Sequence, residues 1–247
     1  MTKIFTLALL LVGSLSLSAQ NWGWGSSKTI RGNGDLINET RDLREFDGVS
    51  ACCNFEVIIT QSSTQSVEIE AESNVMEYIS TEVSGGRLEI GFKENVSLKN
   101  VKDIVITISM RELEYLGASS SAKIITKTAF DGRDLELDAS SGSRITCAFA
   151  GEDIRANVSS GAKIILEGKG QSIKADASSG GNIRAKGFVA VEGEANASSG
   201  GGVEVQVTDE LEADASSGGS VRYTGSVKDV DSDTSSGGSV RRSGPRS

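Results

Sequence analysis

Apolar and polar residues alternate with a period of two over much of the chain. Every second residue from Val49 to Ile59 is apolar or small, and the alternation returns at Val67 and Ile69 and again between residues 104 and 108. This period is typical of β-strands with one buried face. We therefore predict strands between residues 46 and 110, with Ser84-Gly85-Gly86 as a hairpin or corner. Only residues 74–78 could form a helical turn.

From Leu116 onward, the chain repeats itself. A Ser-Ser pair occurs seven times, at successive intervals of 21, 19, 19, 20, 18 and 19 residues. In most copies an Asp or Asn and a small residue precede the pair, and a Gly, two variable positions and an Ile or Val follow it. The pairs are Ser119-Ser120, Ser140-Ser141, Ser159-Ser160, Ser178-Ser179, Ser198-Ser199, Ser216-Ser217 and Ser235-Ser236.

A repeat of about 19 residues is too short for two packed helices, which need about 33 to 47. It is long enough for one closed coil of short strands, since a strand rises about 3.3 Å per residue. The Leu/Asn framework of leucine-rich repeats is missing. We therefore predict an all-β fold, a single-stranded parallel β-helix with an expected right-handed coil.

In this fold, equivalent residues of successive coils stack about 4.8 Å apart. Inward-facing columns should be apolar or small, and small columns imply a flattened coil. Three columns fit, and they read Leu137, Ala156, Ala175, Ala195 and Ala213; Ala139, Val158, Ala177, Ala197 and Ala215; and Ile124, Ile145, Ile164, Ile183, Val203, Val221 and Val240.

The position two before the Ser-Ser pair is Gly117 in the first copy and forms a ladder of Asp and Asn in the other six. Stacked carboxylates would repel one another, and the alternation of Asp with Asn relieves this except at Asp214 and Asp233. One interpretation is structural: each side chain stabilises its own turn through local backbone N–H groups. The other is a binding strip for sugar hydroxyls or Ca²⁺. The candidate binding residues are Asp138, Asn157, Asp176, Asn196, Asp214, Asp233, Ser140, Ser159, Ser178, Ser198 and Ser216.

The sequence offers little for catalysis. It contains no His, so a repeated serine lacks the usual base, and classical zinc sites are absent as well. No coil breaks the pattern with clustered Lys, Arg and acids, as a polysaccharide-active enzyme on this scaffold would require. We predict a non-enzymatic protein without a cofactor or resident metal, and we keep the polysaccharide-active enzyme as the alternative.

The three cysteines are Cys52, Cys53 and Cys147. One interpretation is a disulfide between Cys147 and either Cys52 or Cys53, whereas the adjacent Cys52 and Cys53 are not expected to pair, because adjacent cysteines rarely do so. The stronger reading treats Cys53 and Cys147 as small core residues, because they follow the apolar alternation.

The first nineteen residues have the layout of a secretory signal peptide: Lys3, an apolar run from Ile4 to Val12, then small residues. The run is about half the length of a membrane span. We expect export to the periplasm, the outer-membrane surface or the medium. Residues 20–31, with Trp22 and Trp24, form a leader, residues 32–242 one β-helix domain (less regular coils in 32–115, Ser-Ser-Gly coils in 116–242), and residues 243–247 a tail.

Several motifs resemble a family of exported Bacteroidetes proteins, the putative auto-transporter adhesin, head GIN domain. They are Thr40–Val49, Phe55–Gln61, Gly86–Ile90 and Leu113–Gly117, followed by the serine-glycine coils, and they span roughly Gly32 to Val240 in order. The resemblance implies an exported β-helical domain with a surface or envelope role, and it carries over no catalytic residue.

The net charge of −9 and the absence of a clustered basic face argue against a nucleic-acid partner. We expect a structural or binding module that recognises a glycan or a surface protein through a repetitive face. No transmembrane span is expected. The open end of the last coil, near Val240, also predicts a homo-oligomer, because exposed strand edges pair readily.

Overall fold

The computed structural model describes residues 28–93 and 96–244. Its regular elements are strands, apart from the short helix α1 (Ser73–Met76) at the predicted helical turn. The predicted signal peptide, both leader tryptophans and the last three residues of the tail lie outside the described residues. No helix in the described part of the chain is long and apolar enough to cross a membrane.

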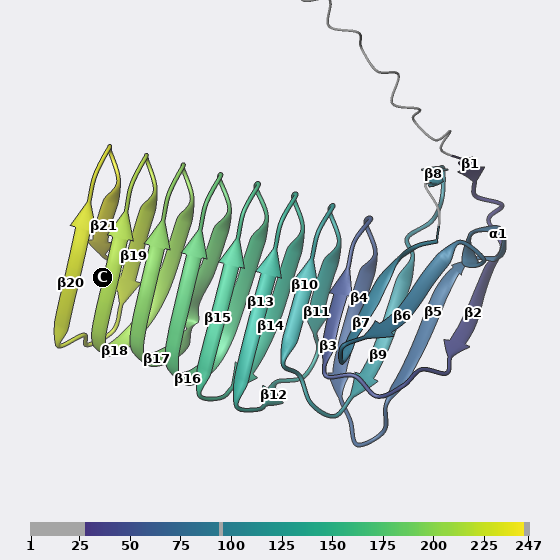
Figure 1. Cartoon of the computed structure of the whole chain (residues 1–247), viewed down its shortest axis with the longest axis horizontal. Coiled ribbons are helices and arrows are strands. Elements are labelled where there is room, and N and C mark those ends of the chain that lie inside the picture. The colour runs from purple at the N-terminus through teal and green to yellow at the C-terminus, as the bar shows by residue number, and fades with distance from the viewer. Residues whose placement is uncertain (1–27, 94–95, 245–247) are drawn as a thin grey trace, which may run out of the picture.

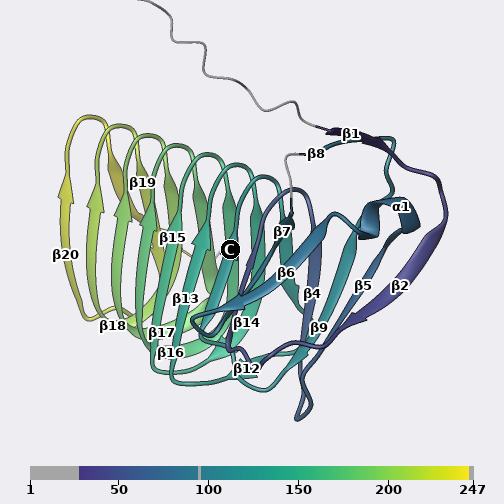
Figure 2. The same cartoon turned by 45° about the vertical axis from the view of Figure 1, so that its right-hand side comes forward.

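Each coil of the repeat has two strands, joined at one edge by the Ser-Ser turn and at the other by a bend (Figures 1 and 2). The first strands that stand alone are β10 (Tyr115–Ala118), β13 (Asp134–Ala139), β15 (Asp153–Val158) and β20 (Asp229–Thr234). The second strands are β11 (Lys123–Thr126), β14 (Arg144–Ala150), β19 (Ser220–Thr224) and β21 (Ser239–Arg242).

Three longer strands pass around the bend without interruption. They are β16 (Lys163–Ala177), β17 (Asn182–Ala197) and β18 (Gly202–Ala215), each the second strand of one coil and the first strand of the next. The two-residue β12 (Phe130–Asp131) pairs with β14 at the bend. These elements build the predicted β-solenoid.

Successive coils pair in parallel and in the predicted register. Ile124 lies beside Ile145, Ile145 beside Ile164, and the column continues to Val240. The small columns are also confirmed, since Leu137 pairs with Ala156 and Ala139 with Val158. A slip of one residue would turn these side chains to solvent, so burial of one face fixes the register.

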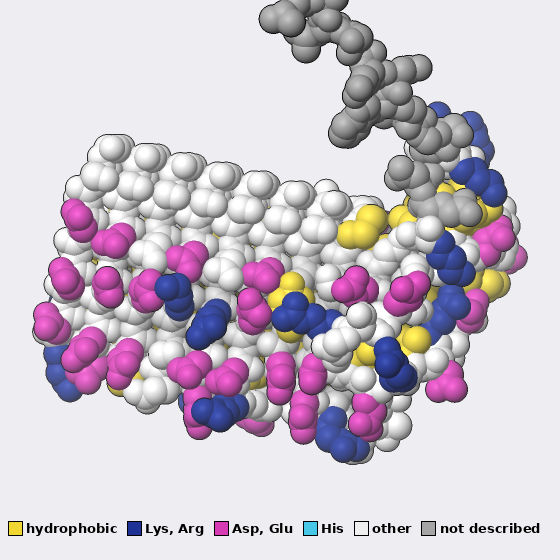
Figure 3. Space-filling view, in the orientation of Figure 1, with side chains coloured by type: hydrophobic (Ala, Val, Ile, Leu, Met, Phe, Trp, Pro, Cys, Tyr) yellow, Lys and Arg dark blue, Asp and Glu magenta, His cyan; other side chains and the backbone are white. Residues whose placement is uncertain are grey.

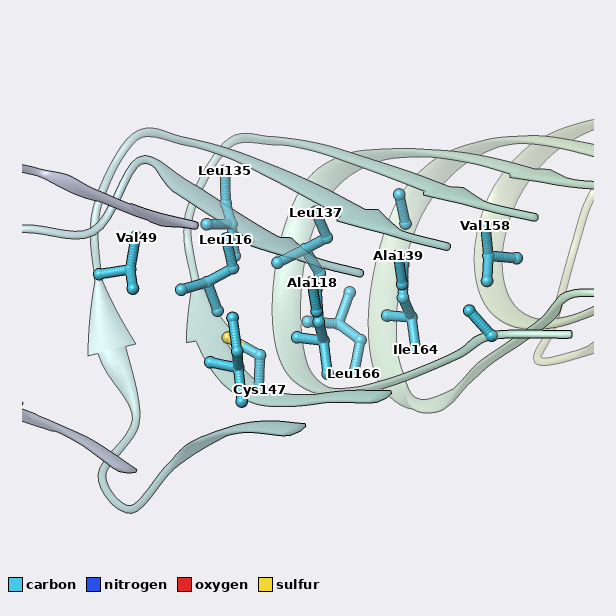
Figure 4. Packing of buried hydrophobic residues seen from close by; sticks show 14 of the residues in the cluster. Val49, Leu116, Ala118, Leu135, Leu137, Ala139, Cys147, Val158, Ile164 and Leu166 are labelled. Carbon is cyan, nitrogen blue, oxygen red and sulfur yellow. The ribbon is translucent and has the colours of Figure 1, made fainter. Parts of the chain in front are cut away.

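The core lies between the two strands of each coil (Figure 4). Side chains from both strands fill it, and Cys147 is buried among them at 1% exposure, as predicted. Large aromatic rings lie towards the bend, where the ring of Phe149 lies next to Gly132 and the ring of Phe188 lies next to Gly170. The coil is therefore narrow at the serine turn and wider at the bend.

Residues 32–115 do not simply continue the coils. Strands β3 (Gly48–Ala51) and β4 (Glu56–Gln61) form one regular coil, which lies between β10 and β11 on one side and β7 (Arg87–Phe92) and β9 (Val105–Met110) on the other. Beyond it, β6 (Ile79–Ser84), β5 (Ser66–Glu72) and β2 (Leu36–Arg41) run antiparallel to their neighbours. A separate pair, β1 (Lys28–Arg31) and β8 (Val96–Lys99), is parallel.

The antiparallel strands have a local cause. Gly85 and Gly86 both have positive φ angles, 55° and 79°, which form the two-residue turn of a tight hairpin between β6 and β7. Strand β6 of this hairpin covers the edge of β7, and β5 covers the edge of β9. The N-terminal end of the solenoid therefore consists of antiparallel strands, whereas the C-terminal end of the described chain is the regular coil of β20 and β21.

Candidate binding groove

The Asp/Asn ladder lies on the outward face of the first strands. Consecutive members pair in register from coil to coil, beginning at Gly117 and passing through Asp138 and Asn157 to Asp233. The first strands alternate between exposed and buried residues, so the apolar neighbours of each ladder residue point inward. One repeat position therefore becomes a straight row with a step of about 4.8 Å.

Side-chain hydrogen bonds connect alternate pairs of the ladder. Asn157 donates from Nδ2 to Oδ1 of Asp138 at 3.0 Å, and Asn196 donates to Oδ1 of Asp176 at 2.9 Å. Asn196 also donates to Oε1 of Glu194 at 3.0 Å. These bonds join neighbouring coils or neighbouring side chains. The turn-stabilising interpretation expected hydrogen bonds to the local backbone, and the side chains of the described ladder residues form none.

The serine turns form a second row beside the ladder. The second Ser of each pair has a φ near 50°, as at Ser141 (52°) and Ser160 (50°), and the following Gly is also positive, as at Gly142 (72°). The first Ser accepts a hydrogen bond at its carbonyl from the residue three positions later, for example from Ser143 to Ser140 at 3.1 Å. Two positive φ angles and this bond define a tight turn that glycine favours.

The turns are also bonded to one another. The N–H of Gly142 donates to the carbonyl of Ser160 at 3.1 Å, and Gly161 donates to Ser179 at 3.2 Å. The parallel ladder of backbone hydrogen bonds therefore continues through the corners. The first serine of each pair, whose side chain lines the groove, is therefore held at the same spacing as the Asp/Asn ladder.

Together the two rows line a shallow groove with a volume of about 790 Å³. The groove runs past six successive ladder residues, and it includes every serine and ladder residue predicted from the sequence: Asp138, Asn157, Asp176, Asn196, Asp214, Asp233, Ser140, Ser159, Ser178, Ser198 and Ser216. In Figure 3 the edge that carries the turns is free of charged side chains.

Tyr115 and Ser50 also line the groove near its N-terminal end, and the sequence pattern did not point to Tyr115. Its ring lies over Gly117, where a Cβ atom would stand 2.7 Å from the phenol oxygen. The guanidinium of Arg87 covers the ring at 3.6 Å from its centroid. Burial, then the nearby Asp138 carboxylate, raise the pKa of Tyr115 to about 12. The absence of a side chain at Gly117 was the signal that something else occupies this ladder position.

The groove is acidic. Asp138, Asp176, Asp214 and Asp233 line it, and among the described residues no Lys or Arg does. The same face carries two further outward rows, which read Asp134, Asp153, Ser172, Glu192, Glu210 and Asp229, and Glu136, Arg155, Lys174, Glu194, Glu212 and Asp231. Figure 3 shows acidic side chains spread over this face. The arrangement favours neutral or cationic ligands over anionic ones.

The opposite face has the reverse charge. Outward positions of the second strands include Lys123, Arg144 and Lys163 in one row, and Arg184, Glu204, Arg222 and Arg241 in the next. The solenoid is therefore polarised across its thickness. Neither face, in the described part of the chain, gathers three Asp, Glu, Cys or His side chains into a group suited to a metal ion.

Two predictions for the adjacent cysteines were wrong: that they would not pair with each other, and that Cys53 would be a core residue, since Cys53 is only partly buried. Cys52 and Cys53 form a disulfide with each other. The pair occupies the turn between β3 and β4, where Ala51 pairs with Ala118 and the N–H of Asn54 donates to the carbonyl of Ser120. Cys52-Cys53 therefore stands in register with Ser119-Ser120, and Cys53 and Asn54 have the positive φ angles (63° and 64°) of the other turns. The small residue before each pair, Ala51 or Ala118, was the signal in the sequence.

Cys147 is the remaining cysteine and is free and buried. Burial raises the pKa of its thiol to about 12, only partly offset by Thr126. The thiol is therefore protonated and acts as a small apolar core group, as predicted.

Comparison with solved structures places this fold among bacterial proteins. A putative adhesin from Bacteroides fragilis is 19% identical, with a TM-score of 0.81 over 87% of this chain and 100% of the other. One from Parabacteroides merdae is 21% identical, with a TM-score of 0.74 over 88% and 100%. A protein from Parabacteroides distasonis described as a putative lipid binding protein is 18% identical, with a TM-score of 0.73 over 88% and 100%.

At these identities the similarity concerns the fold. A search of curated proteins finds no match to the chain. A family model matches residues 45–227, which cover the N-terminal coil, the hairpin, the groove as far as Ser216 and all but the last serine turn. The chain belongs to the family described as putative auto-transporter adhesin, head GIN domain.

Proposed function

We propose that this protein is an exported, adhesin-type binding module whose groove binds a neutral glycan. The observation that carries the proposal is the repetition of the same polar set, an Asp or Asn beside a Ser hydroxyl, on successive coils of one groove. A ligand built of repeating units can place equivalent hydroxyl groups on equivalent subsites. Membership in a family described as adhesins supports a binding role.

The chemistry of the groove favours hydroxyl-rich ligands. Carboxylates accept hydrogen bonds from hydroxyl groups, Asn side chains donate and accept, and Ser hydroxyls do both. Oδ1 of Asp138 and Oδ1 of Asp176 each accept one hydrogen bond from a ladder amide. A polymer of uronic acids would bring like charges against four Asp side chains, so we expect it to bind poorly.

Glycan-array binding by purified protein tests the proposal. We expect binding to neutral polysaccharides and at least about tenfold weaker binding in Asn157→Ala and Asn196→Ala, the loss of one or more good polar contacts. Asn182→Ala is the matched control, because Asn182 lies on an outward position of the second strand, away from the groove. Equal binding by both ladder variants and the wild type would remove the groove as the binding site.

A further inference from the structure

The last coil leaves both of its outer strand edges without a partner among the described residues. β20 pairs only with β18, and β21 only with β19. All six residues of β20 are exposed, and Val230 is 36% exposed although its register partner Leu211 is 2% exposed. Open strand edges with apolar side chains beside them favour pairing with another chain.

The opposite end of the solenoid is not built as a regular coil. There the antiparallel strands β5 and β6 pair with β9 and β7, and α1 and β2 lie beyond β5. Head-to-tail stacking would therefore not continue the parallel coils, because β6 runs antiparallel to the strand beside it. Pairing of two C-terminal edges remains, and it requires a two-fold axis with the same surface on both copies.

Two such arrangements keep the strands antiparallel, and charge distinguishes them. In one, β20 pairs with β20 of the second copy, which sets Asp229, Asp231 and Asp233 against the same acids. In the other, β20 pairs with β21 of the second copy, which carries Arg241 on its outward face. Like charges directly opposite one another are destabilising, and opposite charges stabilise the pair.

The alternation of outward and inward side chains supports the pairing of β20 with β21 of the second copy. Asp231, Asp233 and Arg241 point outward, while Val230 and Val240 continue buried columns. A register that keeps outward residues together sets Arg241 opposite Asp231 or Asp233, because antiparallel partners share one face. None of these three charged side chains forms an ion pair within the described chain. Each pairing occurs twice across the two-fold axis.

We propose that the protein forms a two-fold dimer through its last coil, with β20 of each copy paired antiparallel to β21 of the other. Val230 and Val240 of both copies become buried in a continuous core. The acidic face of one copy then meets the basic face of its partner at the joint, so the two acidic faces lie on opposite sides of the dimer.

Light scattering after size-exclusion chromatography tests the dimer. We expect a dimer mass for the wild type, and at least about tenfold weaker association in Arg241→Glu and in the double variant Asp231→Arg with Asp233→Arg. An equimolar mixture of these two proteins should restore a one-to-one dimer, because one of its two β20–β21 joints keeps the original Asp–Arg contact and the other contains the reversed Arg–Glu contact. Arg184→Glu, in the same outward row three coils away, is the control and should remain dimeric.

Three results would overturn the proposal. A wild-type monomer at every concentration would show that another occupant, such as a segment outside the described residues, covers the edge. A mass that grows beyond the dimer would show open-ended assembly. Failure of the mixed variants to associate, with both folded by circular dichroism, would exclude the β20–β21 pairing.

Discussion

The amide of Asn157 donates a hydrogen bond to the carboxylate of Asp138 on the preceding coil, at 3.0 Å between Nδ2 and Oδ1. On its other side Asn157 pairs in register with Asp176. One amide therefore separates two carboxylates in a row whose step is about 4.8 Å. The alternation of Asp and Asn therefore stabilises the stack of coils, independently of any role in binding.

Asn157→Asp should destabilise the fold by about 1 kcal/mol at low salt, because three carboxylates then occupy consecutive coils and a hydrogen bond is lost. Urea unfolding at low salt and at about 1 M salt measures the effect, which should shrink as screening increases. Asn182→Asp is the control, since its neighbours in register are Lys163 and Gly202. An equal loss in both variants at low salt would contradict the explanation.

Alanine substitutions at two glycines distinguish the cost of backbone strain from the cost of a steric clash. Gly161 has a φ of 71° and open space where a Cβ atom would stand, so Gly161→Ala should cost about 1 kcal/mol through backbone strain alone. At Gly168, φ is 123° and a Cβ atom would stand 1.9 Å from the carbonyl oxygen of Phe149. Gly168→Ala should therefore cost about 3 kcal/mol or more. Similar midpoints of urea unfolding for both variants would refute this distinction.

Tyr115 should make the fold sensitive to alkali. Burial and Asp138 raise its pKa from 10.0 to about 12, so the unfolded chain loses the phenolic proton at lower pH than the folded protein does. Stability from this difference is complete below pH 10 and disappears as the pH rises towards 12. Tyr115→Phe should lessen the fall in melting temperature over this range. The same slope in both proteins would assign the effect to other groups.

The double variant Cys52→Ser with Cys53→Ser should keep the fold. The pair stands in register with Ser119-Ser120, so the variant recreates the turn of the following coils. A disulfide between adjacent residues closes almost no loop, and its effect on the unfolded chain is correspondingly small. We expect a change in unfolding free energy within about 1 kcal/mol. Loss of the folded circular dichroism spectrum would show that the disulfide itself holds this turn.

The repeat made much of the fold predictable. An interval of about 19 residues and apolar columns such as Ile124 to Val240 predicted the parallel coils and their register, because stacking multiplies one pattern over many coils. The N-terminal part was harder. Alternation at residues 67–69 and 104–108 predicts strands, but it does not say whether neighbouring strands run parallel or antiparallel.

The groove was predictable in part for the same reason. Asp138 and its equivalents share a repeat position, so their row follows from the register. Tyr115 and Cys52-Cys53 do not repeat, and their places depend on which coils meet: β3 precedes β10 by more than sixty residues in sequence, yet it lies beside it in space. The sequence marks these places only by single residues, Gly117 and Ala51, which the interval of the repeat does not single out.

The bend edge explains how coils of unequal length remain aligned. The serine turns are spaced by 18 to 21 residues, yet the ladder stays in register. The differences are absorbed in irregularities between Ile165 and Glu167, Ala185 and Val189, and Ala190 and Glu192. The bend is thus the natural place to graft a loop or a peptide tag, and whole coils could be duplicated there to lengthen the scaffold in fixed steps.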